Sequence, residues 1–163
     1  MSERAARIAL GVVSGLALLA AFAIDLPKAA DGRFWSDGAT YYAMAGSLAF
    51  DGDLRFEAED LARVRASYPG GPQGVFLKRV TDGSGAPRLV YAKAIVYPAA
   101  AAPLVRLLGA DRGLLVLNAL AFATALWLGF ALLHRAPGAG RAAAGVLAVV
   151  AGGVVPVYLL WQT

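Results

Sequence analysis

Three stretches of uncharged, mainly apolar residues alternate with polar segments and predict helices that cross a membrane. They cover residues 8–24, 113–133 and 142–163, which contain no Asp, Glu, Lys, Arg or His. A helix needs about 20 such residues to cross about 30 Å of hydrocarbon. The segment 25–111 between the first two stretches holds ten of the eleven acidic residues. The pattern therefore predicts a mainly α, polytopic membrane protein with three transmembrane helices and one large polar loop.

Composition and charge placement support this class. Charged residues make up 16% of the chain, against about 25% in a typical soluble domain. The net charge of +4 comes from basic residues at the ends of the apolar stretches, which is typical of membrane spans and not of a nucleic-acid-binding surface. These residues are Arg4, Arg7, Arg112, Arg135 and Arg141. The absence of cysteine excludes disulfides and thiolate metal sites.

A fourth apolar stretch, residues 94–105, is too short to span because twelve helical residues rise only about 18 Å. The basic loop 134–141 and the basic N-terminus both predict a cytoplasmic location. Both segments are cytoplasmic if the chain crosses the membrane outwards at 8–24 and returns at 113–133. Residues 26–111 are then extracytoplasmic, and 94–105 is a short interfacial or re-entrant helix. The abundance of Ala, Gly and Arg is typical of GC-rich bacterial genomes, so the inner membrane is the expected location. A cleaved signal peptide is the alternative for 8–24, but two further apolar stretches favour a retained helix.

The predicted organisation has three parts. Residues 1–25 form the first transmembrane helix, 26–111 the mixed α/β extracytoplasmic loop, and 112–163 two further transmembrane helices that continue into a longer protein. Turn residues and alternating apolar positions divide the loop further. The expected elements are a loop at 26–36, a helix through 40–49 with a turn at 51–53, a helix at 58–66, a break at 69–72, and a hairpin of strands 74–80 and 87–91.

Asp37 is the first candidate for chemistry because it follows the first apolar stretch and precedes Tyr41 and Tyr42. A carboxylate at a membrane surface can accept a proton from a hydroxyl group or ligate a divalent cation. Spacing alone favours a simpler role, in which Asp37 is the N-cap of the helix that follows. The two tyrosines are, by default, aromatic residues of the membrane interface.

Lys93 is the second candidate because it stands at the start of the short apolar stretch 94–105. An ammonium group there can hold a lipid phosphate as a point charge. It can equally extend towards the headgroups without any specific ligand. Arg106, further along, is expected to be an ordinary headgroup anchor.

A cluster of acidic residues lies near the middle of the loop, at Asp51, Asp53, Glu57, Glu59 and Asp60. It lacks the central glycine and terminal glutamate spacing of an EF-hand, so a solvated acidic surface is favoured. The sequence contains no phosphate-binding loop, no dinucleotide-binding motif and no zinc-protease motif. Asp37 and Lys93 are therefore the candidates for chemistry, if the chain performs any.

The order of these features resembles the N-terminal part of GT-C-fold membrane glycosyltransferases, the group of protein mannosyltransferases and bacterial aminoarabinose transferases. A short first span precedes a large outer loop that opens with the segment 37–45, an acidic residue followed by aromatic and small residues. The loop closes with 91–98, which is similar to a Lys-Pro-Pro stretch of the family, although Ala94 stands at the first proline. Gly38 stands where the family often has a second acidic residue.

The resemblance implies an inverting transfer of a sugar from a polyprenyl-phosphate carrier on the extracytoplasmic side. It implies that Asp37 is the catalytic base or a metal-associated carboxylate, and that Lys93 holds the phosphate of the carrier. Tyr41, Tyr42 and Tyr97 become candidate substrate-binding residues. A divalent cation is a possible cofactor, and the partners are membrane lipid and the lipid-linked sugar, with no nucleic acid.

Two alternatives from other classes stay open. The chain could be a non-enzymatic membrane subunit for transport or assembly, with a periplasmic binding loop. It could also be a signal-anchored periplasmic domain with a helical-hairpin tail. Further spans and another acidic residue in an outer loop would favour the enzyme.

Overall fold

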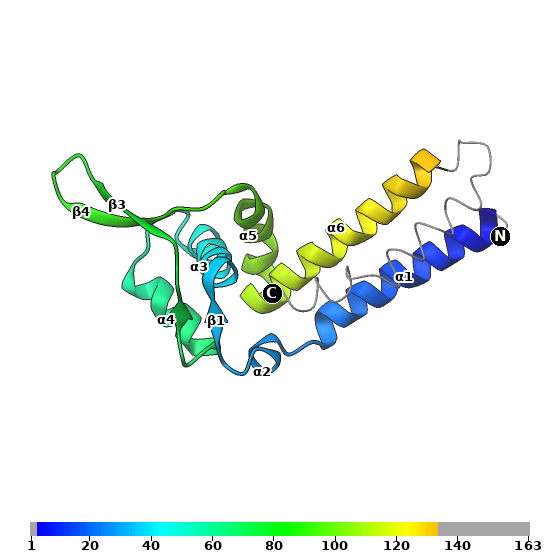
Figure 1. Cartoon of the computed structure of the whole chain (residues 1–163), viewed down its shortest axis with the longest axis horizontal. Coiled ribbons are helices and arrows are strands. Elements are labelled where there is room, and N and C mark those ends of the chain that lie inside the picture. Colours follow the sequence, from blue (N-terminus) through cyan, green and yellow to red (C-terminus); the bar gives the residue numbers. More distant parts are fainter. Residues whose placement is uncertain (1–2, 134–163) are drawn as a thin grey trace. The chain divides into compact units, whose positions relative to one another are not determined.

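The computed structural model describes residues 3–133, and most of them are helical (Figure 1). The chain divides into two compact units, Met1–Ala23 with Leu115–Thr163, and Ile24–Leu114. The mainly α fold class is confirmed for the described residues. The predicted span 142–163 and the basic loop 134–141 lie outside the described residues.

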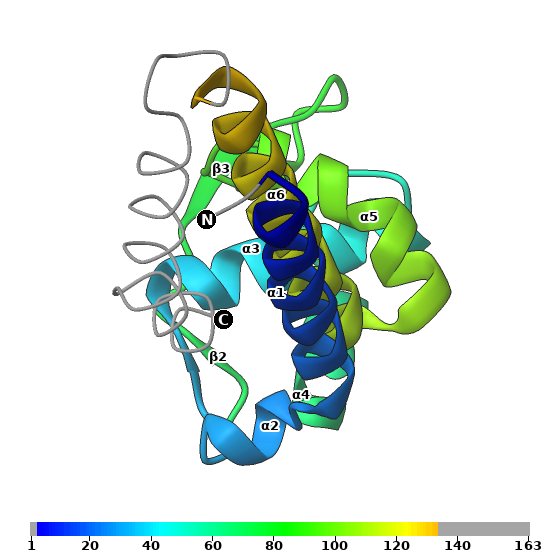
Figure 2. The same ribbon diagram turned by 90° about the vertical axis from the view of Figure 1, so that its right-hand side faces the viewer.

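The first unit contains α1 (Glu3–Ala23) and most of α6 (Ala110–Leu133). Ala6 and Leu10 of α1 belong to one buried cluster with Phe122, Leu126 and Phe130 of α6, and Figure 2 shows the two helices side by side. Both helices are long and apolar enough to cross a membrane, each with a mean hydropathy of 2.0. Length and composition make them candidates only, because a core helix or a signal sequence has the same properties.

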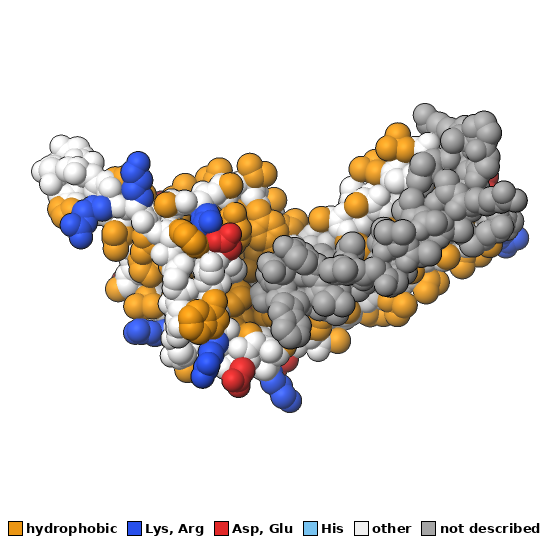
Figure 3. Space-filling view, in the orientation of Figure 1, with side chains coloured by type: hydrophobic (Ala, Val, Ile, Leu, Met, Phe, Trp, Pro, Cys, Tyr) orange, Lys and Arg blue, Asp and Glu red, His pale blue; other side chains and the backbone are white. Residues whose placement is uncertain are grey.

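Much of the apolar surface of α1 is not covered by protein. Ile8, Val12, Leu16 and Leu19 are all more than half exposed, and the side chains of α1 and α6 that Figure 3 shows are largely hydrophobic. A helix in the core of a water-soluble protein buries such side chains. The exposure therefore favours a lipid environment for α1.

The second unit contains the remaining elements, in an order that matches much of the predicted pattern. The prediction of a helix at 58–66 is confirmed, and so is the hairpin, although its first strand begins later than expected. The segment 26–36 is not a simple loop, because it contains a short helix and a strand. The elements are α2 (Leu26–Ala29), β1 (Phe34–Trp35), α3 (Ser36–Phe50), α4 (Ala58–Ser67), β2 (Pro72–Gln73), β3 (Leu77–Thr81), β4 (Pro87–Tyr91) and α5 (Val96–Leu108).

The two sheets of this unit are both two-stranded. β1 pairs in parallel with β2, and β3 pairs antiparallel with β4. In the hairpin turn, Asp82 accepts hydrogen bonds from Ser84 and Ala86 and pairs with Arg88, and these contacts lower the pKa of its carboxyl group. In Figure 3 Lys and Arg side chains are visible along the hairpin, behind its tip. The turn is thus stabilised by its own residues.

Close helix packing holds the centre of the second unit. α3 and α5 pack against each other, with Ala39 and Ala43 of α3 and Ala101 of α5 all buried. Small side chains allow two helix backbones to approach closely. At the start of α6, a Cβ atom on Gly113 would lie 2.6 Å from the backbone nitrogen of Val105. Only glycine fits there, so this residue allows the first turn of α6 to lie close to the backbone of Val105.

An aromatic cluster connects β1, α3 and α4. The Phe34 ring stacks on Tyr68 at 4.7 Å, and Tyr42 meets both rings edge-on. The Tyr68 hydroxyl donates a hydrogen bond of 2.9 Å to Asp111 in the first turn of α6. Burial, and then the charge of Asp111, raises the pKa of Tyr68, so its phenol stays protonated and remains a donor.

Candidate functional site

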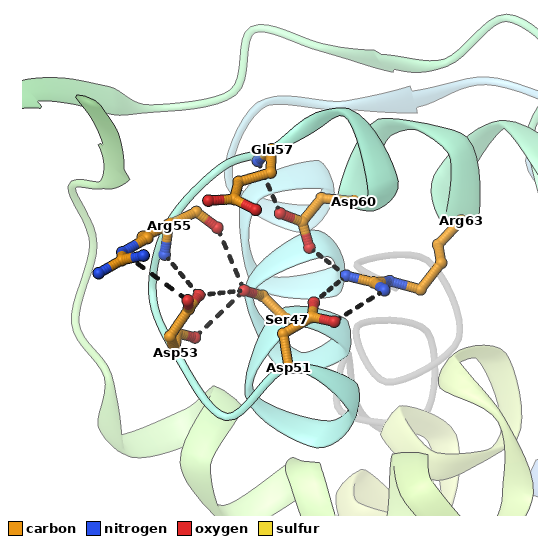
Figure 4. A network of polar contacts seen from close by, with 7 residues as sticks. All are labelled: Ser47, Asp51, Asp53, Arg55, Glu57, Asp60 and Arg63. Carbon is orange, nitrogen blue, oxygen red and sulfur yellow. Dashed lines mark hydrogen bonds and ion pairs between the residues drawn. The ribbon is translucent and has the colours of Figure 1, made fainter. Parts of the chain in front are cut away.

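Outside the hairpin turn with its Asp82–Arg88 pair, two polar regions of the second unit contain paired acidic and basic side chains, and the first is the network in Figure 4. Asp60 is only 2% exposed and accepts hydrogen bonds from the Glu57 backbone and from Arg63. Arg63 also pairs with Asp51 at the end of α3. Glu57 and Asp60 form a capping box at the start of α4. The expectation of a solvated acidic surface is therefore wrong for Asp60, which is a buried structural residue.

The remaining residues of the network fix the turn after α3. The Ser47 hydroxyl lies 3.1 Å from the carbonyl oxygen of Asp53 and 3.2 Å from that of Arg55. The Asp53 carboxylate in turn accepts a hydrogen bond from the Arg55 backbone. Figure 4 shows these groups pointing towards one another around the end of α3. Most polar groups of the network pair with neighbouring residues, although the buried Nε atom of Arg63 has no hydrogen-bond partner among residues 3–133.

The second polar region is an ion pair between the two candidate residues. The Lys93 Nζ atom lies 2.8 Å from a carboxylate oxygen of Asp37. Asp37 is in the first turn of α3, whereas Lys93 lies between β4 and α5. The Asp37 side chain is 56% exposed and that of Lys93 is 25% exposed. The structure thus brings together two residues that are distant in sequence, in a position that a ligand can reach.

The expected capping role of Asp37 is wrong. The N-cap of α3 is Trp35, which makes no side-chain capping hydrogen bond, and the helix begins at Ser36. Asp37 therefore lies inside the first turn, where a carboxylate interacts favourably with the helix dipole while its oxygens stay free for other partners. Ser36 has a φ of 55°, an uncommon conformation for a residue other than glycine. Such conformations cluster at functional sites.

Thr40, which the sequence analysis did not identify, positions the surroundings of the pair. Its buried hydroxyl donates to the Ser36 carbonyl oxygen at 2.9 Å and accepts from the Phe76 backbone N–H at 3.0 Å. The Phe76 carbonyl oxygen in turn accepts from the Ala92 N–H, next to Lys93. Phe76 is thereby fixed between the two halves of the site.

Phe76 also contacts the cation directly. The Lys93 Nζ atom lies 3.9 Å from the centre of the Phe76 ring, a cation–π contact. The ammonium group therefore has a carboxylate partner and an aromatic partner. No sequence motif surrounds Phe76, so only the fold could reveal this contact.

The three candidate tyrosines divide into two groups. Tyr41 of α3 meets Tyr97 of α5 edge-on at 5.6 Å. Tyr41 stands one helical turn after Asp37 within α3, whereas Tyr97, in the first turn of α5, follows the non-helical Lys93 by four residues. Tyr42 is buried in the aromatic cluster with Phe34 and Tyr68, and burial raises the pKa of its phenol. Tyr42 is thus a core residue in the described unit.

A metal site is not formed by the acidic residues that the structure describes. Between residues 3 and 133, no group of three or more His, Asp or Glu side chains is arranged to hold a metal ion. The partner of Asp37 in the same region is a cation, Lys93. A divalent cation at Asp37 would need ligands from elsewhere, such as a substrate phosphate.

Comparison of the chain with protein-family models, curated protein sequences and solved structures gives no match. The structure defines a mainly helical chain with two candidate membrane-spanning helices. In its second unit the Asp37–Lys93 ion pair is accessible to solvent and lies beside the Phe76 ring. These features are the basis for the functional proposal.

Proposed function

We propose that the chain is the N-terminal part of a membrane glycosyltransferase that moves a sugar from a polyprenyl-phosphate carrier to an extracytoplasmic acceptor. In this arrangement the N-terminus is cytoplasmic, three helices span the inner membrane, and 26–111 is the outer loop with a short interfacial helix. Two candidate spans and the resemblance of the segments 37–45 and 91–98 to the GT-C family support the proposal.

The observation that carries the proposal is the 2.8 Å contact between Asp37 and Lys93. The transfer needs a cation to compensate the charge of the departing phosphate and a base to accept a proton from the acceptor. The two side chains supply these two groups in one place. Both side chains are at least partly exposed, so a phosphate and a hydroxyl group can reach them.

The chemistry follows from competition for the ammonium group. A carrier phosphate that binds Lys93 displaces the Asp37 carboxylate, which is then free to accept a proton. The acceptor oxygen attacks the anomeric carbon of the sugar, and the bond from that carbon to the phosphate oxygen breaks. The phosphate leaves with the electron pair towards Lys93, and the acceptor proton passes to Asp37.

Complementation of a deletion strain tests this proposal with the full-length protein. Mass spectrometry of glycans and lipid-linked sugars should show a product that disappears in the deletion strain and returns with the wild type. Asp37→Asn should lower its formation at least about a hundredfold, because a general base contributes about that much. The matched control Asp82→Asn removes another paired carboxylate of the same unit and should restore the product. Full restoration by Asp37→Asn would rule out the catalytic role.

One observation favours the alternative of a non-enzymatic membrane subunit. The charges of Asp37 and Lys93 neutralise each other in the structure, as they would in a purely structural link between α3 and the segment before α5. A subunit with a binding loop needs no free base. In that case the deletion strain would show unchanged glycans, and Asp37→Asn would affect assembly or transport only through stability.

A further inference from the structure

The outward face of α5 is apolar along its whole length. Val96 is 76% exposed and Leu107 is 78% exposed, with exposed Ala100 and Pro103 between them on the same helical face. The opposite face, with Pro98, Ala101 and Val105, is buried in the unit. In Figure 3 hydrophobic side chains cover the visible surface of α5. A helix that is apolar on both sides is typical of an environment without bulk water.

Another short helix of the same unit gives the contrast. α4 also packs one face inwards, through Asp60 and Val64. Its exposed residues include Glu59 and Arg65 beside Ala62, as expected for a helix in contact with water. A short helix of this unit can therefore have a polar outer surface. The apolar outer surface of α5 needs a separate explanation.

Length and charge decide what covers α5. Its 13 residues extend about 20 Å, too short to cross about 30 Å of hydrocarbon. Lys93 precedes the helix, and the exposed Arg106 in its last turn has no acidic partner among residues 3–133. The charge of Lys93 is balanced by Asp37, whereas the Arg106 guanidinium contacts only the Phe50 ring, at 5.3 Å, among the interactions described for it. The Arg106 charge at the end of the apolar face therefore complements an anionic lipid headgroup.

The apolar surface continues from α5 to the ion pair. Ile95 and Phe76 are exposed large hydrophobic residues. Phe76 contacts the Lys93 ammonium group, which itself contacts Asp37. A membrane that covers α5 would therefore reach the edge of the candidate site and bring it to the depth of the headgroups.

We propose that Phe76, Ile95 and the outer face of α5 form a membrane-contact surface that lies in the headgroup–acyl boundary and prefers anionic phospholipid. The proposal refines the membrane arrangement suggested above and rests on that arrangement, not on sugar transfer. Its occupant is the bilayer itself. Coverage by another protein segment or by a second copy of the chain is the competing outcome.

The absence of cysteine from the sequence makes a labelling test direct. Two single-cysteine variants are made, Ala100→Cys on α5 and Ala62→Cys on α4, and each is labelled with the same environment-sensitive fluorophore. Both positions are exposed alanines in helices of the same unit. The full chain is reconstituted in vesicles that contain brominated lipid, and iodide is added to the water. We expect lipid quenching and loss of iodide quenching at position 100, with the reverse at position 62.

Two other results would contradict the proposal. Equal iodide quenching at both positions would mean that α5 faces water. Protection of position 100 from both quenchers would mean that protein covers it.

Lipid selectivity is tested with brominated phosphatidylglycerol against brominated phosphatidylcholine at position 100. One unpaired cation predicts about a fivefold preference for the anionic lipid, which Arg106→Gln should remove. Equal quenching by the two lipids in the otherwise unchanged chain would contradict the preference. Sugar transfer can fail while these results hold, so the two proposals are separable.

Discussion

The two polar regions of the second unit contain similar groups in different settings. Asp60 is buried, and its partners come from the same helix or from the residue just before it. Asp37 is largely exposed, and its partner Lys93 comes from a distant part of the chain. A buried carboxylate with several partners stabilises the fold. An exposed carboxylate with one cationic partner contributes little stability and remains available to a ligand.

The same substitution at both aspartates gives the strongest test of this difference. Asp60→Asn should lower the free energy of unfolding by about 2 kcal/mol, because it weakens a buried, charge-assisted contact with Arg63. Asp37→Asn should cost less than about 1 kcal/mol, because its ion pair is exposed. Chemical unfolding of the full chain in detergent measures both. Equal losses would mean that the two regions serve the same structural purpose.

A smaller effect is expected at Thr40, whose hydroxyl group connects α3 to the Phe76 backbone beside the Asp37–Lys93 pair. Thr40→Val should cost about 1 kcal/mol, because the partly buried N–H of Phe76 loses its acceptor. Thr40→Ser keeps the hydroxyl group and should stay close to the wild type. If valine and serine have the same effect on unfolding, the hydroxyl does not hold Phe76 beside Lys93.

Local patterns predicted the local elements of this fold. The pattern of residues 58–66 indicated α4, and the turn residues 81–85 indicated the hairpin, because these elements depend on neighbouring residues. The spacing of Glu57, Asp60 and Arg63 also contains the signal for the network around Asp60, since residues three apart meet on a helix. The analysis instead treated the acidic residues as a solvated group.

The contacts that define the candidate site depend on the whole fold. Asp37 and Lys93 were identified singly, yet nothing in their local sequence predicts that they touch. α3 begins at Ser36, which has a positive φ, and this start leaves Asp37 free of the capping role. The Phe76–Lys93 contact and the Tyr68–Asp111 hydrogen bond also join segments that are far apart along the chain. Local sequence therefore does not predict them.

Binding of a polyprenyl monophosphate to the full chain in lipid nanodiscs tests the central claim most directly. If the phosphate competes with Asp37 for Lys93, Lys93→Gln should weaken binding about tenfold, because a charge-assisted contact is lost. Asp37→Asn should tighten binding about threefold, because the cation is released from its partner. These opposite changes are the result that we expect. Unchanged affinity in both variants would show that the ion pair is a structural link and does not bind phosphate.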